Sequence, residues 1–202
     1  MNSEKFNYFE GTTFRAGRER DLETYEDHLG FKRKDLEGKR VLELGSGERE
    51  IFSKELKESV KDVDIVLLNP DYLNKEYREN ISKQSNIRIA AIGQSLPFKD
   101  EAFDIILGLY SLTVFSAPYQ NKEGASAWAK EILRVLKSGG KAILGPAGGG
   151  KDNEDAVEST KKEYEYIIKQ LKEEKANVII ESYQPFSSKF IYNSRIVIEK
   201  PL

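Results

Sequence analysis

Glu43, Gly45 and Gly47 are the residues of this 202-residue chain whose types and spacing most clearly suggest ligand chemistry. They follow a short apolar run at 41–44 and precede a segment with helical character. Glycine in such a turn tolerates positive φ and lets a ligand lie directly on the backbone. In open α/β sheets, nucleoside-like ligands bind where a strand ends in a glycine turn and a helix begins. The pattern predicts a nucleoside site, although a tight strand–helix turn without a ligand would use the same glycines.

The charges beside this turn narrow the class of nucleoside. Glu48 and Glu50 fall in the expected first turn of the helix, where they suit the helix dipole but would repel a pyrophosphate. The dinucleotide fingerprint requires a third glycine where the chain has Glu50, and no phosphate-binding P-loop motif is present. A nucleoside with a positive centre and no phosphates fits better. S-adenosylmethionine (SAM) is such a ligand.

Composition excludes several other functions. The net charge of −2 argues against bulk electrostatic binding of nucleic acid. The absence of cysteine excludes a disulfide framework and a thiol nucleophile. With a single histidine, no His-rich metal site is expected, and we predict no metal. The first ten residues show no signal peptide and no apolar run reaches membrane-spanning length, so we expect a cytoplasmic protein.

Strands alternate with helices along the chain, which is typical of a mostly parallel sheet. The expected strands are 41–44, 64–68, 87–92, 103–109, 141–144, 178–183 and 195–199. The expected helices are 17–29, 49–57, a short one from Tyr72, 123–137 (stopped by Ser138-Gly139-Gly140) and 156–175. The loop 184–193 is too short for a crossover helix, so the last two strands should pair antiparallel.

The predicted fold class is therefore α/β: a Rossmann-like, seven-stranded, mostly parallel sheet with a C-terminal antiparallel hairpin and helices on both faces. We expect a single domain over 1–202, with an N-terminal helical arm or lid at 1–38 and an α/β core at 39–202.

Three segments, in order, resemble the class I SAM-dependent methyltransferases over roughly 38–144. They are Glu43-Leu-Gly-Ser-Gly47, Gln94-Ser-Leu-Pro-Phe98 followed by Glu101-Ala-Phe-Asp-Ile-Ile106, and Glu131-Ile-Leu-Arg-Val-Leu-Lys-Ser-Gly-Gly-Lys141. The resemblance implies SN2 transfer of a methyl group from SAM to a small organic acceptor, with the protein aligning donor and acceptor.

The resemblance also assigns roles to individual positions. It places Glu43 at the amino end of the methionine moiety and the Gly45-Ser46-Gly47 turn against the cofactor. The remaining cofactor positions are Asn69, Pro70 and Asp71 near the ribose and adenine, Gly93 and Gln94 beside the adenine ring, and Leu109 and Tyr110 near the reactive methyl.

Three positions depart from the family pattern. Arg49 stands where the motif has a third glycine. The acid that usually binds the ribose would fall near Leu67 or Leu68, and the acid that often binds adenine would fall at Ile92. Asp71, in the turn that follows, is a nearby substitute for the ribose-binding acid. These departures leave open an alternative, a degenerate member of the fold that acts as a binding or regulatory partner. An NAD or nucleotide-sugar enzyme is a third reading.

Other residues have both a chemical and a structural reading. His28 and Tyr110 are the candidate catalytic residues, although His28 fits an ordinary, partly exposed helix position better. An aromatic and arginine cluster could form a lid or a solvated face: Phe14, Arg15, Arg18, Arg20 and Tyr25. Asp104 should cap backbone amides and Trp128 should lie in the core. Asn69-Pro-Asp-Tyr72 resembles the Asn-Pro-Pro-Tyr motif of nucleic-acid methylating enzymes, but it follows the wrong strand, which argues against a nucleic-acid acceptor.

Overall fold

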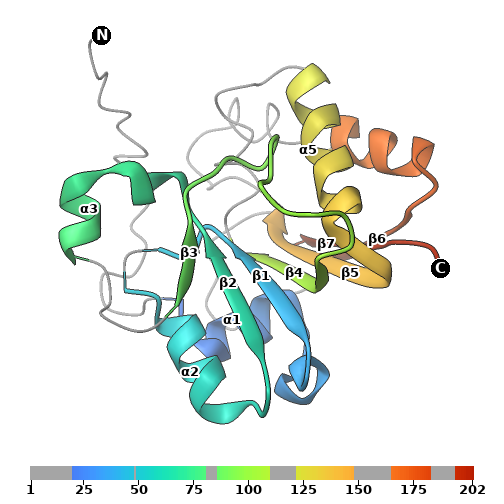
Figure 1. Ribbon diagram of the computed structural model, residues 1–202. Coiled ribbons are helices and arrows are strands. Elements are labelled where there is room, and N and C mark those ends of the chain that lie inside the picture. The colour runs from blue at the N-terminus through green and yellow to red at the C-terminus, as the bar shows by residue number, and fades with distance from the viewer. Residues whose placement is uncertain (1–19, 48, 81–85, 110–121, 148–164, 183–193) are drawn as a thin grey trace, which may run out of the picture.

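The computed structural model describes residues 20–47, 49–80, 86–109, 122–147, 165–182 and 194–202. A seven-stranded sheet with the order β3-β2-β1-β4-β5-β7-β6 forms its centre, and β7 runs opposite to the other six strands (Figure 1). The strands are β1 (Arg40–Leu44), β2 (Asp64–Leu68), β3 (Ile87–Ile89), β4 (Phe103–Leu109), β5 (Leu136–Ala147), β6 (Asn177–Ser182) and β7 (Ser194–Glu199). The predicted fold class, including the C-terminal antiparallel pair, is confirmed.

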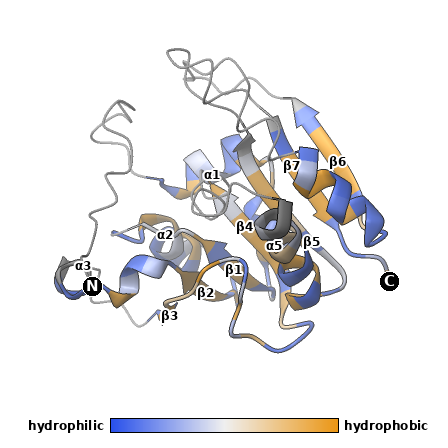
Figure 2. Cartoon of the chain, turned by 90° about the horizontal axis from the view of Figure 1, so that it is seen from above, coloured by the Kyte–Doolittle hydropathy of each residue, from blue (hydrophilic) through white to orange (hydrophobic). Residues whose placement is uncertain are grey.

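Helices cover both faces of this sheet. They are α1 (Leu22–Leu29), α2 (Ile51–Ser59), α3 (Lys75–Asn80), α5 (Lys122–Val135), an unlabelled helix at 165–173, and the 3-10 helices η1 (Arg33–Leu36) and η2 (Pro70–Leu73). One buried cluster joins the sheet to α1 and α2, and a second joins it to α5 and helix 165–173. Figure 2 shows hydrophobic residues concentrated on the strands, between these helical layers. None of the helices described is long and apolar enough to cross a membrane.

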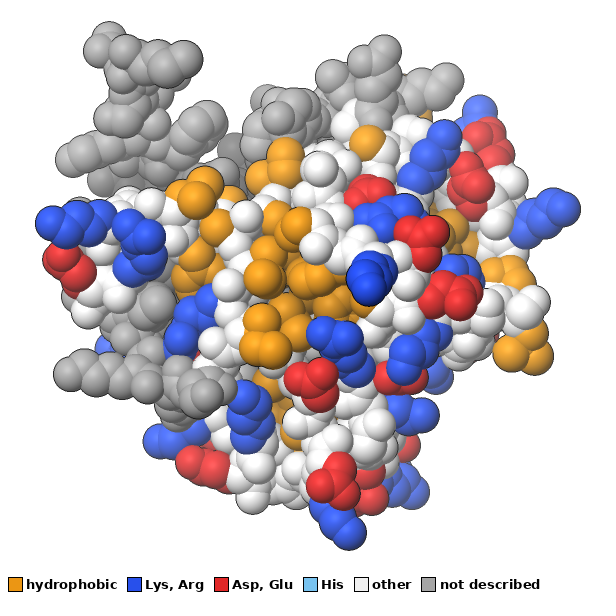
Figure 3. Space-filling model, viewed as in Figure 1, with side chains coloured by type: hydrophobic (Ala, Val, Ile, Leu, Met, Phe, Trp, Pro, Cys, Tyr) orange, Lys and Arg blue, Asp and Glu red, His pale blue; other side chains and the backbone are white. Residues whose placement is uncertain are grey.

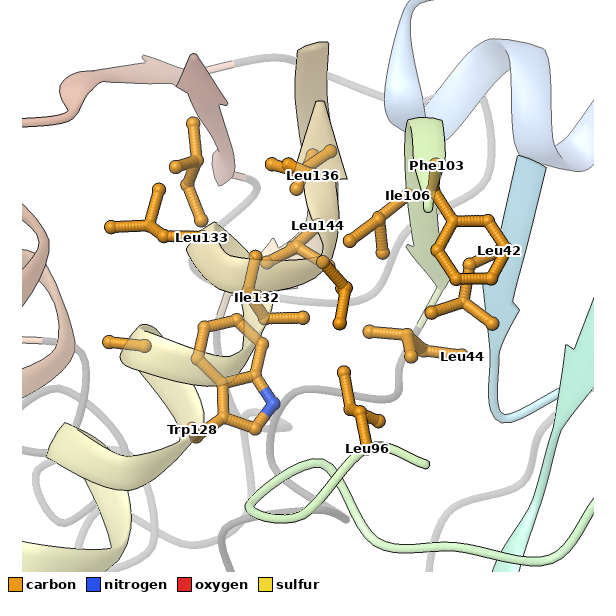
Figure 4. Packing of buried hydrophobic residues seen from close by; sticks show 14 of the residues in the cluster. Leu42, Leu44, Leu96, Phe103, Ile106, Trp128, Ile132, Leu133, Leu136 and Leu144 are labelled. Carbon is orange, nitrogen blue, oxygen red and sulfur yellow. The ribbon is translucent and has the colours of Figure 1, made fainter. Parts of the chain in front are cut away.

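The alternation of β1 assigns each of its side chains to a face. Leu42 and Leu44 pack in the cluster on the α5 side, where Trp128 is buried as predicted and lies among Ile132, Leu144 and Leu96 (Figure 4). Val41 packs on the opposite side, with α1 and α2. Because side chains alternate along a strand, Glu43 faces the α1 side with Val41.

Helix α1 is fixed at its start and along its buried face. The Asp21 carboxylate caps it by accepting from Thr24 N at 2.8 Å, so the helix begins at Leu22 and not at the expected residue 17. The Leu22 amide donates to Glu55 Oε2 at 2.8 Å, and the rings of Tyr25 and Phe52 stack with centroids 3.8 Å apart. These contacts hold α1 against α2, beside the end of β1.

The prediction that Ser138-Gly139-Gly140 stops a helix is wrong. Helix α5 ends at Val135, and β5 begins at Leu136 and runs through both glycines. A register shift between Phe103 and Ile105 marks a bulge there. A Cβ on Gly140 would lie 2.8 Å from Lys137 O and 2.9 Å from Asp104 O, so Gly140 permits a close backbone approach.

Several other boundaries differ by a few residues. The third strand ends at Ile89 and not at 92, and Ile92 forms an isolated bridge to Ser95. Helix α2 begins at Ile51 and not at 49, and the segment from Pro70 divides into η2 and α3. The described part of the expected 156–175 helix covers 165–173. Asp104 accepts from Arg40 N at 2.8 Å, which confirms its capping role.

Candidate active site

The predicted turn lies at the carboxyl ends of β1 and β4, where the strand order of the sheet reverses direction. Strand β1 pairs with β2 on one side and with β4 on the other. Ligands of open α/β sheets bind at such a switch point. Glu43 is aligned with Leu67 of β2 and with Leu107 of β4, so it lies between these two strands near their carboxyl ends.

Glu43 is fully buried, and only one of its two carboxylate oxygens has a hydrogen-bond partner among the described residues. Its Oε1 accepts a 2.7 Å hydrogen bond from the Tyr25 hydroxyl. Its Oε2 is buried and has no hydrogen-bond partner within the described ranges. Burial raises the pKa of Glu43 to about 8, against smaller lowering effects of the Tyr25 hydrogen bond and the charge of Arg20. A buried carboxyl with a vacant oxygen is a site for a cationic hydrogen-bond donor.

The glycine turn has the backbone that the sequence predicts. Gly45 and Gly47 have φ of +75° and +70°, which favour glycine. The Gly45 amide donates to Leu68 O at 2.7 Å, which joins the turn to the end of β2. A Cβ built on Gly47 would meet nothing within 4 Å, so the space beside the turn is open to a ligand.

Arg20 comes from the N-terminal segment to the same edge. One of its guanidinium nitrogens donates to Gly45 O at 2.8 Å and to Leu109 O at 3.1 Å, at the ends of β1 and β4. Arg20 and Tyr25 of the predicted arginine and aromatic cluster therefore reach the site. Phe14, Arg15 and Arg18 lie outside the described residues.

Glu50 provides a contrast to Glu43 at the same edge. They are the only buried carboxylates among the described residues. Glu50 occupies the N-cap position of α2 without a capping side-chain bond. Its carboxylate accepts from Arg88 Nε at 2.5 Å and Nη2 at 2.7 Å, from Tyr72 OH at 3.0 Å and from Asn86 Nδ2 at 2.9 Å. Both of its oxygens are thus used within the protein. Glu43 differs from Glu50 in keeping one oxygen without a hydrogen-bond partner in the described part of the chain.

The side of the turn toward β2 and β3 contains no exposed carboxylate at the positions where the family has acids. Leu67 is fully buried, and Ile92 is 37% exposed. Asn69 Oδ1 accepts from the Asp71 amide at 2.9 Å and caps η2, while the Asp71 side chain is exposed. Figure 3 shows hydrophobic side chains gathered on the face over β3 and the segment that follows it. This side of the site can contact a ring by apolar surface.

The two residues expected to be catalytic have different outcomes. His28 is buried on α1, so its expected partial exposure is wrong, and burial lowers its pKa below the ordinary value. The error arose because its sequence neighbours are charged, while α1 packs against α2, β4 and β5. A catalytic role for His28 stays a prediction. Tyr110 lies outside the described residues, and Arg49, the departure from the third glycine, is exposed.

These residues fit SAM at its amino-acid end. The vacant Glu43 oxygen suits an α-ammonium, the Arg20 guanidinium suits a carboxylate, and the glycine turn leaves space between them. At the nucleoside end the fit is apolar, through Ile92. No cluster of three or more metal-ligating side chains occurs in the described ranges. Sequence reasoning missed the Glu50–Arg88–Tyr72 contacts, because the three residues belong to separate elements and share no motif.

Comparison with known proteins agrees with this geometry. A family model described as a methyltransferase domain matches residues 42–144, just over half of the chain. No curated protein matches it.

Three similar solved structures share the fold at low sequence identity. A SAM-dependent methyltransferase from Methanosarcina mazei is 15% identical with a TM-score of 0.55, and the match covers 85% of this chain and 95% of that one. The methyltransferase of a Haloferax volcanii complex with a methyltransferase activator is 14% identical with a TM-score of 0.59, over 89% and 92% of the chains. A Thermotoga maritima SAM-dependent methyltransferase, described as a possible histamine N-methyltransferase, is 19% identical with a TM-score of 0.51, over 81% and 82%. Because the family model spans just over half of the sequence, the chain belongs to the methyltransferase-domain family and is a SAM-dependent methyltransferase.

Proposed function

We propose that the protein methylates a small organic molecule and that Glu43 is the residue that recognises the amino group of SAM. The half-satisfied, buried Glu43 carboxylate beside the glycine turn carries this proposal. A buried carboxyl without a second partner costs free energy in the free protein, and a bound ammonium would remove that cost. The Thermotoga maritima neighbour, described as a possible histamine N-methyltransferase, is consistent with this acceptor class.

The remaining residues of the edge supply orientation. Arg20 places a guanidinium beside Glu43, so the two side chains would bind the carboxylate and the ammonium of one α-amino acid group. Gly45 and Gly47 admit the ligand against the backbone, and Ile92, Gly93 and Gln94 border the ring. Pro70 and Asp71 follow Asn69, whose cap starts η2, and in this proposal they flank the ribose side.

The chemistry depends mainly on positioning. Bound SAM supplies an electrophilic methyl group on a sulfonium centre. The protein has to hold the amino-acid end at Glu43 and Arg20, so that the methyl group meets the acceptor in line. Leu109 ends β4 and its own carbonyl accepts from Arg20, and we propose that its side chain lines the floor under the methyl group. An acidic phenol, enol or amine acceptor would need little help from a base.

A labelling experiment tests the acceptor class. The purified protein is incubated with SAM labelled in its methyl group and with a cell extract divided by dialysis into small molecules and macromolecules. Label in the dialysable fraction, lost in Glu43→Gln, supports the proposal. Label in protein or nucleic acid alone would contradict the small-molecule acceptor. Binding of S-adenosylhomocysteine without transfer to any fraction would favour a binding role for the fold.

A further inference from the structure

Glu50 lies at the centre of a buried polar network that joins three elements, α2, β3 and η2. Its carboxylate comes from the N-cap of α2 and is held by Arg88 of β3 through two guanidinium nitrogens. Asn86, just before β3, donates to Oε2, and Tyr72 of η2 donates to Oε1. The hydrogen bonds and charge of Glu50 also raise the pKa of Arg88, so this guanidinium stays charged.

The backbone of Glu50 requires this support. Its φ of +51° lies in the left-handed region, which a non-glycine residue adopts only when its surroundings hold it there. A fully buried carboxylate is likewise kept only where it is paired and hydrogen-bonded. The network therefore fixes both the conformation and the charge of Glu50, only three residues after Gly47.

Tyr72 connects this fixed group to the glycine turn. Its hydroxyl lies 3.0 Å from Glu50 Oε1 and 2.6 Å from the Ser46 hydroxyl. Ser46 is the central residue of the turn, between two glycines with positive φ. Because glycine restricts its own backbone so little, contacts from outside must select one conformation of the turn. Within the described part of the chain, the Ser46–Tyr72 hydrogen bond is the only one that a side chain of the Gly45–Gly47 turn makes.

We propose that Glu50 and Arg88 are positioning residues, which fix the Gly45–Gly47 turn through Tyr72 and Ser46 in the conformation that binds the cofactor. The consequence for affinity rests on the proposed function of that turn; the consequence for its mobility does not. The network also assigns the Ser46 hydroxyl a partner within the protein, so Ser46 acts on the turn and not directly on the ligand. A turn that is fixed before binding loses less entropy on binding.

The test uses Tyr72→Phe, which removes the link to Ser46 and leaves the Glu50–Arg88 ion pair in place. Amide hydrogen exchange at 45–47 is measured in the ligand-free protein, and S-adenosylhomocysteine affinity is measured by calorimetry. We expect exchange to become about fivefold faster and affinity to fall about fivefold, the equivalent of one hydrogen bond. Ser46→Ala removes the same bond, so the double variant should be no worse than either single variant. Arg88→Lys, which keeps the charge and loses the paired geometry, should change both values in the same direction.

Asp104→Asn is the matched control. It weakens a partly buried ion pair with Lys137 at the opposite end of the sheet, so it should lower the melting temperature without changing exchange at 45–47. Unchanged exchange in Tyr72→Phe, or an equal change in Asp104→Asn, would overturn the proposal. So would faster exchange with unaltered affinity. If the wild-type protein bound no S-adenosylhomocysteine, the proposed function would fail, while the exchange data would still decide whether the network fixes the turn.

Discussion

The Tyr25 hydroxyl donates a 2.7 Å hydrogen bond to Glu43 Oε1 and so connects the N-terminal helix to the end of the central strand β1. Burial and the Glu43 carboxylate raise the pKa of Tyr25 well above its ordinary value, so the phenol remains a donor. The bond satisfies one oxygen of a buried carboxyl and leaves the other without a partner in the described residues. Helix α1 is therefore part of the proposed site and not only a cover for the sheet.

Replacement of Glu43 by glutamine should stabilise the free protein at neutral pH while it abolishes cofactor binding. A carboxyl whose pKa rises from about 4.5 to about 8 on folding contributes stability below pH 4.5 and loses it progressively toward pH 8. Each pH unit in that window costs roughly 1.4 kcal/mol in the ideal case. Thermal unfolding from pH 5 to 8 should show a declining melting temperature for the wild type and a flatter curve for Glu43→Gln. Parallel curves would show that Glu43 ionises normally.

Gly47→Ala should weaken binding much more than it weakens the fold. The positive φ of +70° costs a side chain about 1 kcal/mol. A Cβ there meets no protein atom within 4 Å, so it would project into the space proposed for the ligand. Gly38→Ala is a matched control, with φ of +64° and equally open surroundings. Both variants should lose similar melting temperature, and only Gly47→Ala should lose affinity in calorimetry. Equal affinities would place the ligand elsewhere.

Tyr25→Phe should raise the pKa of Glu43 further, because the Tyr25 hydrogen bond lowers it in the wild type. Removal of a donor from a buried carboxyl should also cost about 1–3 kcal/mol at a pH where Glu43 is ionised. Urea unfolding at pH 6 and pH 9 measures this effect. The destabilisation should be larger at pH 9, and a loss that is independent of pH would indicate packing alone.

Arg20→Gln should distinguish the two ends of the amino-acid group. If the guanidinium binds the carboxylate, the variant should lose about 1.5–3 kcal/mol of affinity for S-adenosylhomocysteine, as expected for a charged hydrogen bond. It should lose little affinity for the decarboxylated analogue, which lacks the group. Calorimetric titration with both ligands provides the comparison. An equal loss for both would limit Arg20 to its contacts with Gly45 O and Leu109 O.

Most of the fold could be predicted because its strands are local signals. The predicted strands 64–68 and 103–109 are apolar apart from Asp64 and Asp104, and they matched the observed strands to the residue, since a buried parallel strand needs no alternation. Gly139 and Gly140 were misread, because paired glycines suit a helix stop and a strand bulge equally. The choice between the two depends on Asp104 O and on backbone bonds to Lys200, which are distant in sequence.

In the candidate site, too, the pattern of neighbouring residues could be predicted, and the contacts between distant elements could not. Glu43, Gly45 and Gly47 lie within five residues, so their spacing alone predicted the turn. The vacancy at Glu43 Oε2 and the saturation of Glu50 could not be predicted, because they depend on which side chains of α1, η2 and β3 reach each carboxylate. Arg20 belonged to a cluster with two readings, and its contacts with Gly45 O and Leu109 O could not be predicted because those carbonyls are distant in sequence.

Proton release on binding is the measurement that tests the role of Glu43 most directly. S-adenosylhomocysteine is titrated into the protein at pH 7 in buffers with different ionisation enthalpies, with NAD as a control ligand. With a pKa of about 8, Glu43 is mostly protonated at this pH, and it has to ionise to pair with the α-ammonium. We predict micromolar binding with release of close to one proton, no release from Glu43→Gln and no binding of NAD. Micromolar binding without proton release, or with the same release in Glu43→Gln, would contradict the assignment of Glu43 to the amino group.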